Sequence, residues 1–183
     1  MPTLEPQEYT LKTGERAIVR SPEVADAARM REITVKAMGE GEYHITEGDE
    51  FTFTTEQIAS WITLCAASES NLLLVAEVDG VVQGSLNFEV GDRRRTRHAG
   101  TLAMSVDARW RERGLGFALL DALLRWAEGQ PQVERVGLSV LSGNARAQRL
   151  YEKMGFVEEG RRMKALKIAP DRYVDEVLMA RPV

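Results

Sequence analysis

The feature that most constrains this chain is an apolar segment that leads through a short glycine-rich turn into an amphipathic helix. Residues 99–106 predict a strand, and residues 114–126 predict a helix with one apolar face. The first turn of a helix has unpaired backbone N–H groups and a partial positive charge. Gly114 and Gly116 allow a bulky anion to reach those groups, because neither residue carries a Cβ. The segment therefore predicts a pyrophosphate site, with a plain strand-to-helix connection as the alternative.

Two other nucleotide-binding readings of this loop fit poorly. A P-loop nucleoside triphosphatase needs Lys and Ser or Thr after the last glycine, whereas Gly116 is followed by Phe117 and Ala118. A dinucleotide-binding fold needs three spaced glycines and a repeating parallel unit, and neither is present. Arg111 and Arg113 supply positive charge at the rim, which suits an anion.

The order of predicted elements indicates a mixed α/β sheet with helices on both faces. Residues 1–14 contain two prolines and predict a loose N-terminal extension, followed by one domain over residues 15–183. The Ser21-Pro22 pair predicts the start of the first helix. The predicted strands cover residues 16–20, 72–76, 82–90, 99–106, 136–141, 157–164 and 173–180, and the predicted helices cover 23–38, 55–65, 114–126 and 144–154.

Composition narrows the function classes. The formal net charge of the 183 residues is −4, which argues against a bulk nucleic-acid binder. The one cysteine, Cys65, excludes an intrachain disulfide and fits a reducing compartment. The sequence has neither a signal peptide pattern nor an apolar run long enough for a membrane span, so we expect no membrane association and a cytoplasmic location.

Two blocks together resemble the GNAT superfamily of N-acetyltransferases. The first is Arg111-x-x-Gly114-x-Gly116 after a strand, and the second is Asn-x-x-Ala-x-x-x-Tyr-x-x-x-Gly-Phe over residues 144–156. The resemblance covers roughly residues 15–181. It implies a single domain with a mostly antiparallel sheet of about six to seven strands. It also implies direct transfer of an acetyl group from acetyl-CoA to a primary amine in a ternary complex.

The resemblance assigns cofactor contacts residue by residue. The strand before the loop separates from its neighbour in the family, and the pantetheine arm pairs along it. Asn144 would touch the cofactor near the pantetheine, although it is also a good N-cap for its own helix. Lys153 would approach the adenosine end. The arm would follow Met104, Ser105 and Val106, and the pyrophosphate would meet Arg111, Glu112, Arg113, Gly114, Leu115 and Gly116.

The resemblance implies that Tyr151 is the catalytic acid. A phenol has a reference pKa near that of a thiol, so it can share its proton with the leaving sulfur. The alternative is an aromatic side chain that packs beside Leu150 and Phe156. A backbone N–H of Met104 or Ser105 is the family-like donor to the developing oxyanion.

The general base is less defined, because residues 99–106 contain no acid where many family members have a glutamate. Glu89 or His98 could act through water, and each could equally be a solvated surface residue. An acidic loop favours a cationic amine acceptor by Coulomb attraction, or is merely solvated. Its carboxylates are Glu40, Glu42, Glu47, Asp49 and Glu50.

The remaining features point away from other chemistry. The basic run at residues 93–97 predicts a solvated hairpin turn rather than a contact with nucleic acid or an anionic partner. Cys65 lies on an apolar helix face and predicts core packing. His44 and His98 are too isolated for a metal site, so no metal is expected. The competing function is a non-catalytic acyl-CoA-binding regulatory domain of the same fold. A homodimer is also an expectation, since dimers are frequent in such families.

Overall fold

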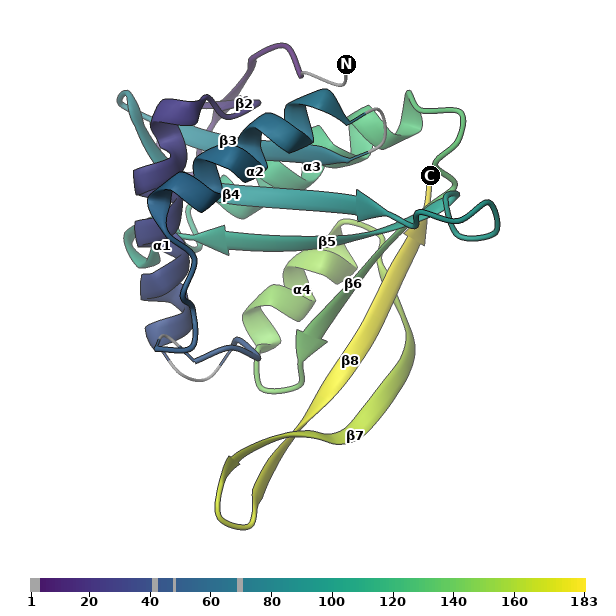
Figure 1. Ribbon diagram of the computed structural model, residues 1–183. Coiled ribbons are helices and arrows are strands. Elements are labelled where there is room, and N and C mark those ends of the chain that lie inside the picture. Colours follow the sequence, from purple (N-terminus) through teal and green to yellow (C-terminus); the bar gives the residue numbers. More distant parts are fainter. Residues whose placement is uncertain (1–3, 41–42, 48, 69–70) are drawn as a thin grey trace.

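The structure is a computed structural model that describes residues 4–40, 43–47, 49–68 and 71–183 (Figure 1). Its described residues form one eight-stranded sheet in the order β1-β2-β3-β4-β5-β6-β8-β7. All neighbouring strands are antiparallel except β5 and β6. The strands are β1 (Gln7–Thr10), β2 (Arg16–Arg20), β3 (Leu72–Val78), β4 (Val81–Val90), β5 (Ala99–Val106), β6 (Arg135–Leu141), β7 (Val157–Ala169) and β8 (Arg172–Pro182). The α-helices are α1 (Ala27–Gly39), α2 (Thr55–Ala67), α3 (Leu115–Glu128) and α4 (Ala145–Lys153).

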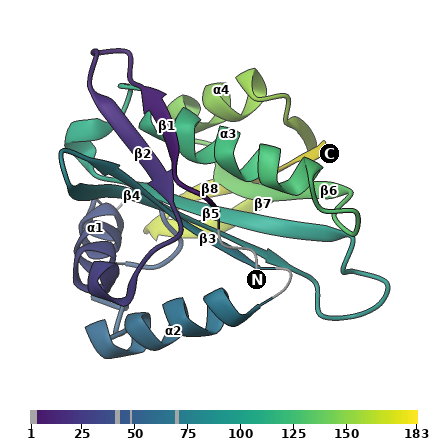
Figure 2. The same cartoon turned by 90° about the horizontal axis from the view of Figure 1, so that it is seen from above.

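The helices cover both faces of the sheet, as predicted. Viewed from above, α1 and α2 lie on one side and α3 and α4 on the other (Figure 2). The α3 side holds the larger core, in which Leu115, Leu119 and Leu123 are fully buried. The α1 and α2 side holds a smaller core that includes Ile33 and Cys65, which confirms the packing role predicted for the cysteine. None of the helices in the described ranges is long and apolar enough to cross a membrane.

The N-terminal segment differs from the prediction of a loose arm. Strand β1 pairs with β2 at the edge of the sheet and raises the strand number to eight. The Tyr9 hydroxyl donates a hydrogen bond to Asp121 Oδ2 on α3 at 2.9 Å. The Lys12 N–H donates to the carbonyl of Arg113 at 2.9 Å. These partners are about a hundred residues away in sequence, so local periodicity could not reveal the strand.

The first helix also starts later than predicted. The Ser21 hydroxyl accepts a hydrogen bond from the Leu4 N–H at 3.0 Å instead of capping a helix. Glu23 and Asp26 form a reciprocal capping box around a short 3₁₀ turn, Val24–Asp26, and α1 follows from Ala27. The prediction that Ser21 caps the first helix was wrong, because its hydroxyl instead bonds to the backbone of Leu4, 17 residues earlier in the sequence.

Strands β5 and β6 are joined only over a short distance. Their parallel pairing covers Ala99–Thr101 against Arg135–Gly137, and beyond it the two strands diverge (Figure 1). Each strand keeps its pairing on the other side, β5 with β4 and β6 with β8. The divergence confirms the separation that the resemblance predicted. It leaves a wedge-shaped opening in the middle of the sheet, behind which α4 lies in this view.

Candidate functional site

The opening between β5 and β6 belongs to a large cavity of about 1230 Å³. One part of the cavity is lined by β5, the start of α3 and the face of α4. The other part continues through the sheet to α1, α2 and the segment between them. The cavity therefore offers two connected compartments on opposite faces of the sheet, which we call the α3–α4 compartment and the α1–α2 compartment.

The first turn of α3 presents backbone amides to the α3–α4 compartment. The helix begins after Gly114, whose φ of 104° is in the left-handed region that favours glycine. The first intrahelical hydrogen bond runs from the Ala118 N–H to the Gly114 carbonyl at 3.0 Å, so the N–H groups of residues 115–117 precede it. A Cβ on Gly116 would lie 3.2 Å from Leu150 Cδ2 and 3.4 Å from Met104 Cε. The space beside Gly116 is therefore narrow, and the absence of a Cβ there leaves the N–H groups of the first turn accessible to a diphosphate.

The two arginines of the loop have different surroundings. Arg111 lines the cavity, but its guanidinium donates to the Val106 carbonyl at 3.0 Å and forms an ion pair with Glu40. Arg113 lies outside the cavity lining and stacks 5.1 Å from the centre of the Trp110 ring. The side chain of Leu115 is buried in the core, so this residue offers only its backbone. Glu112, with a φ of 61°, lines the cavity beside Arg111.

The other predicted cofactor contacts lie along the same compartment. Met104, Ser105 and Val106 line it from the part of β5 that β6 does not pair. Asn144 also lines it, and its Oδ1 accepts a hydrogen bond from the Ala147 N–H at 3.1 Å. The N-cap role of Asn144 is therefore confirmed, and the cap leaves this residue at the cavity wall. Lys153 lines the cavity near the other end of α4.

Tyr151 lies between the core and the cavity. Its ring packs against Phe156 with a centroid distance of 5.9 Å, and only 7% of the residue is exposed. The residue nevertheless lines the cavity, and its hydroxyl makes no hydrogen bond to another described residue. Burial raises the pKa of Tyr151 to about 12. The phenol therefore stays protonated and is available as a donor.

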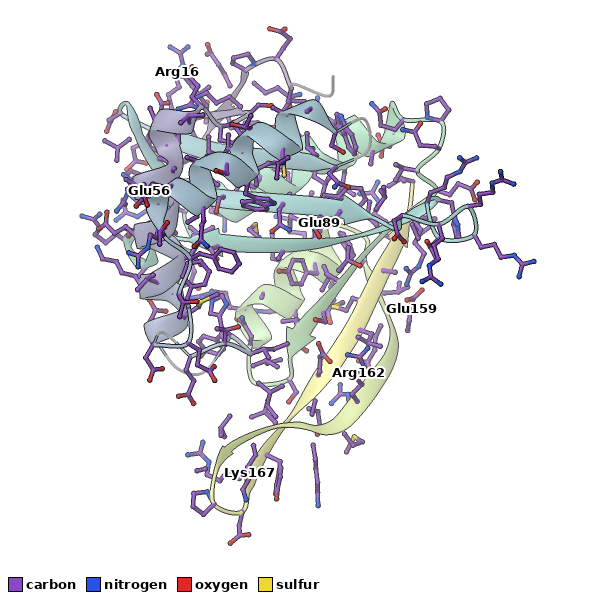
Figure 3. All side chains as sticks on the ribbon, in the orientation of Figure 1. Arg16, Glu56, Glu89, Glu159, Arg162 and Lys167 are labelled. Carbon is purple, nitrogen blue, oxygen red and sulfur yellow. The ribbon has the colours of Figure 1, made fainter. Side chains whose placement is uncertain are left out.

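The structure places one of the two candidate bases, Glu89, at the cavity and the other, His98, outside it. Glu89 on β4 lies opposite Thr101 and lines the cavity with an exposed side chain (Figure 3). His98 lies outside the cavity lining, and its carbonyl accepts hydrogen bonds from the N–H groups of Glu134 and Arg135.

Burial, with a smaller contribution from Glu89, raises the pKa of the Cys65 thiol.

Of the described carboxylates of the acidic loop, Glu40 alone lines the cavity. Glu47, Asp49 and Glu50 are exposed and lie outside the cavity lining, and Glu40 is paired with Arg111. Glu42 falls outside the described residues. The wall of the α1–α2 compartment is aromatic and apolar instead, a feature that the sequence analysis missed because its members are scattered over a loop and two helices. They include Met30, Tyr43, Phe51, Phe53, Ile58 and Trp61.

A buried carboxylate in the cavity was also missed. Glu176 on β8 is 5% exposed and accepts a hydrogen bond from Arg162 Nη1 at 2.7 Å. A hydrogen bond from Ser139, and then the one from Arg162, hold the pKa of Glu176 below its usual range. The residue is therefore ionised at the cavity wall. Strand patterning gave no signal for it, since an acid in an exposed hairpin strand is common.

The sequence analysis judged both histidines too isolated to bind a metal. Of the two, His44 lines the cavity and His98 does not. Burial and the neighbouring charge of Arg111 lower the pKa of His44, so its imidazole is neutral at physiological pH. Among the described residues, no three His, Cys, Asp or Glu side chains gather closely enough to hold a metal ion.

Comparison with known proteins agrees with this geometry. A relative 37% identical over 108 residues is the L-amino acid N-acetyltransferase AaaT of Escherichia coli; the match covers 59% of this chain and 66% of the relative, just under two thirds of its length. An acetyltransferase of the GNAT family from Streptococcus pneumoniae has a TM-score of 0.82 at 28% identity, covering 91% of this chain and 99% of that one.

A second solved structure supports the fold alone. The protein yncA from Salmonella typhimurium, solved with its cofactor acetyl-CoA, has a TM-score of 0.79 at 22% identity, and the match covers 91% of this chain and 93% of the yncA chain.

The sequence model described as the acetyltransferase (GNAT) family matches residues 30–156, which include both predicted motif blocks. The chain belongs to the GNAT family of acetyltransferases.

Proposed function

We propose that this protein is an acetyl-CoA-dependent N-acetyltransferase that transfers the acetyl group directly to a primary amine. The observation that carries the proposal is one continuous cavity, lined by described residues from both faces of the sheet where β5 and β6 separate. Its α3–α4 compartment suits the cofactor, and its α1–α2 compartment lets an acceptor meet the thioester from the other face. Among the described residues that line it there is no cysteine, which favours direct transfer over an acyl-enzyme.

The cofactor would lie along the α3–α4 compartment. The amides at the start of α3 would bind the diphosphate, and the unpaired stretch from Met104 to Val106 would accept the pantetheine arm. Met104 and Leu150 flank Gly116, so the cradle is narrow at that glycine. The relative solved with acetyl-CoA has the same fold, which supports this choice of co-substrate.

The bound thioester supplies an activated acetyl group. The protein positions this group, accepts the proton of the amine and donates one to the leaving sulfur. The N–H of Met104 or Ser105 would donate to the carbonyl oxygen, where negative charge develops as the amine nitrogen attacks. As the new C–N bond forms and the C–S bond breaks, Tyr151 would donate a hydrogen bond or its proton to the leaving sulfur. Glu89 would take the surplus proton of the amine through water. The raised pKa of Tyr151 keeps its hydroxyl protonated, so the residue is present as a donor rather than as a phenolate.

The acceptor is an amine of a small molecule or an exposed amino group of a peptide or protein. Its positive charge would be complementary to Glu89 and Glu176, which line the cavity, rather than to the acidic loop. The relative named as an L-amino acid N-acetyltransferase supports a compact amine. The aromatic wall formed by residues such as Phe51 and Trp61 would hold its apolar part.

The experiment is a thermal-shift titration with acetyl-CoA and CoA, followed by an amine panel read by release of the free thiol. We expect both ligands to raise the melting temperature, because each binds the folded state. We also expect amine-dependent thiol release for at least one compact amine. Failure of either ligand to stabilise the protein would contradict the proposal.

The second candidate is a non-catalytic acyl-CoA-binding domain. It is favoured by one observation, namely that β5 carries no carboxylate and that Glu89 is exposed at the cavity rim. In that case the ligands would stabilise the protein while no amine in the panel would release thiol.

A further inference from the structure

Glu176 on β8 and Arg162 on β7 form an ion pair that joins the cavity wall to the solvent. The two residues are cross-strand neighbours, and Arg162 Nη1 lies 2.7 Å from Glu176 Oε2. The side chain of Glu176 is 7% exposed and lines the cavity, whereas that of Arg162 is 66% exposed on the β7–β8 hairpin (Figure 3). The pair is therefore buried at its carboxylate end and open at its guanidinium end.

Glu176 points toward the face of the sheet on which α1 and α2 lie. On its strand, Val177 and Met179 belong to the larger core on the α3 side, and side chains alternate between the two faces along a strand. Ser139 of β6 lies between two residues of the same core, so it points the same way as Glu176. Both Ser139 and Glu176 line the cavity. The ion pair therefore borders the α1–α2 compartment, from which the acceptor would approach.

Both partners of the ion pair keep hydrogen-bonding capacity. A carboxylate can accept roughly four hydrogen bonds and a guanidinium can donate roughly five. Among the described residues, Glu176 receives bonds from Ser139 and Arg162, and the Arg162 guanidinium donates through Nη1 to Glu176 alone. The neighbouring Arg161, by contrast, uses its Nε and Nη2 on Glu158. A ligand at the pair would thus find a carboxylate and free guanidinium donors side by side.

Such a pair is complementary to a ligand that carries both charges close together. In an α-amino acid the ammonium nitrogen and the carboxyl carbon are about 2.5 Å apart. This separation is similar to the 2.7 Å between the charged atoms of Arg162 and Glu176. Resting on the proposed function, we propose that the acceptor is a free α-amino acid, whose ammonium group binds Glu176 and whose carboxylate binds Arg162.

Other amines fit the ion pair less well. The N-terminus of a peptide offers the ammonium group but has an amide in place of the carboxylate, so it would leave the free donors of Arg162 unused. A diamine would bring a second positive charge beside Arg162 and be repelled by it. The aromatic wall of the same compartment, which includes Phe51 and Trp61, suits an amino acid with an apolar side chain.

The role assigned to Glu176 is to bind the ammonium group and not to remove its proton. Hydrogen bonds from Ser139 and Arg162 hold the pKa of Glu176 below its usual range, so this carboxylate is a weak proton acceptor. The proton would still leave through water to Glu89, after which the neutral amine attacks the thioester. Glu176 should therefore act mainly on KM, whereas Glu89 acts on the deprotonation step.

The test measures kcat/KM with acetyl-CoA for L-phenylalanine, L-leucine and their carboxamides, which lack the negative charge. The variants are R162Q, R162K and E176Q in the full chain. R161Q is the matched control, because it removes the same charge from the next residue, whose fork is bound to Glu158. The ratio of kcat/KM for the acid to that for its amide is compared between proteins, so that the intrinsic reactivity of each amine cancels.

We expect R162Q to lower the acid-to-amide ratio by about tenfold or more, because a charged hydrogen bond to the carboxylate is lost. R161Q should keep the wild-type ratio. R162K should give an intermediate ratio, since lysine keeps the charge but not the planar fork, and it decides the matter if R162Q does not fold. E176Q should raise KM for acids and amides by a similar factor, because both carry the ammonium group.

Three results would overturn the inference. The first is a ratio in R162Q and R162K that equals that of the wild type. The second is an equal loss for acids and amides in these variants, which would make Arg162 a residue that only positions Glu176. The third is a wild type that acetylates the amides but neither free amino acid. Melting temperatures with and without CoA show for each variant that the fold and the cofactor site are intact.

The outcomes for this inference and for the proposed function can be told apart. If another amine of the panel releases thiol while neither amino acid does, the assignment of Arg162 and Glu176 fails and the acetyltransferase function stands. If CoA stabilises the protein but no amine at all releases thiol, both proposals fail and the non-catalytic candidate is favoured. If CoA does not bind, both proposals fail together with the cofactor site.

Discussion

Arg111 and Glu40 form an ion pair that joins the turn before α3 to the residue following α1. The same guanidinium donates to the Val106 carbonyl at 3.0 Å, so its position is set from two sides. Both residues line the cavity, so the pair places a carboxylate in the cavity wall next to the arginine of the loop before α3. Glu40 therefore opposes an anionic ligand while it orders the arginine.

We predict that E40Q lowers the dissociation constant for CoA by about two- to fivefold, because one nearby negative charge is removed at a partly solvated site. Calorimetry at low and moderate salt measures the dissociation constant for CoA, and the difference between E40Q and the wild type should shrink as salt is added. E47Q is the control, since that carboxylate is exposed outside the cavity lining. Weaker binding by E40Q would instead show that Glu40 mainly positions Arg111.

Replacement of Tyr151 by Phe should lower kcat by about 100-fold, the usual scale for loss of a positioned acid. The dissociation constant for CoA should stay the same, because the ring and its packing against Phe156 are retained. Steady-state kinetics and calorimetry on the same preparation separate the two effects. Unchanged turnover would remove the acid assignment.

The pH profile of the wild type gives an independent test of the same hydroxyl. Burial raises the pKa of Tyr151 to about 12, so the acid form is present at neutral pH and is lost only as the pH rises through that value. We predict that kcat shows no fall attributable to this group between pH 7 and about pH 10. A descending limb below pH 10 that vanishes in Y151F would contradict the raised pKa.

For Glu89, the informative variable is again pH. E89Q should lower kcat/KM at pH 7 by about tenfold or more, because the protonated amine then lacks a carboxylate that accepts its proton. The deficit should shrink above about pH 9, where more of the amine is already neutral. E134Q, a change at an exposed residue outside the cavity lining, is the control. A deficit that stays constant with pH would exclude Glu89 as the base.

Asp107 allows a prediction about stability. Its carboxylate accepts hydrogen bonds from the side chain and N–H of Arg109 and from Arg29, and it is 6% exposed. These bonds, that from the Arg109 side chain first, hold the pKa of Asp107 well below its usual range. A depressed folded pKa stabilises the protein fully above the unfolded value of about 4. The contribution starts to decline below about pH 4 and is lost as the pH falls through the lower folded pKa.

The D107N variant should therefore lower the free energy of unfolding by about 1–3 kcal/mol at pH 7. Urea unfolding at pH 7 and at pH 3.5 measures the change, and the difference from wild type should narrow at the lower pH. D92N, in the exposed turn after β4, should be near neutral at both. A difference that grows on acidification would mean that the charge of Asp107 is not what stabilises the fold.

The sequence predicted the parts of this site that depend on local pattern. The passage from β5 into α3 has an apolar strand, two glycines and an apolar helix in direct succession, and the structure reproduces it. The N-cap role of Asn144 and the burial of Cys65 were also predictable, because both follow from a residue's place on its own helix.

Features that depend on distant partners were not predictable. The pairing of Arg111 with Glu40 joins residues 71 positions apart. β1 is ordered by bonds to α3, and the serine expected to cap the first helix is taken by Leu4. The aromatic wall of the α1–α2 compartment and the buried Glu176 come from separate segments, so no single window of sequence contains their signal.

The short contact between β5 and β6 has a mechanical consequence. Within the described part of the chain, the strand pairing between the two halves of the sheet covers Ala99–Thr101 against Arg135–Gly137, with the Glu134 and Arg135 N–H groups bonded to the His98 carbonyl at its end. This short seam is the natural place for one half to pivot on the other. A ligand that binds in the gap and forms hydrogen bonds with both β5 and β6 would restrict this movement. Amide exchange along Leu138–Leu141 should then slow on ligation more than exchange in β2 or β3, which lie far from the hinge.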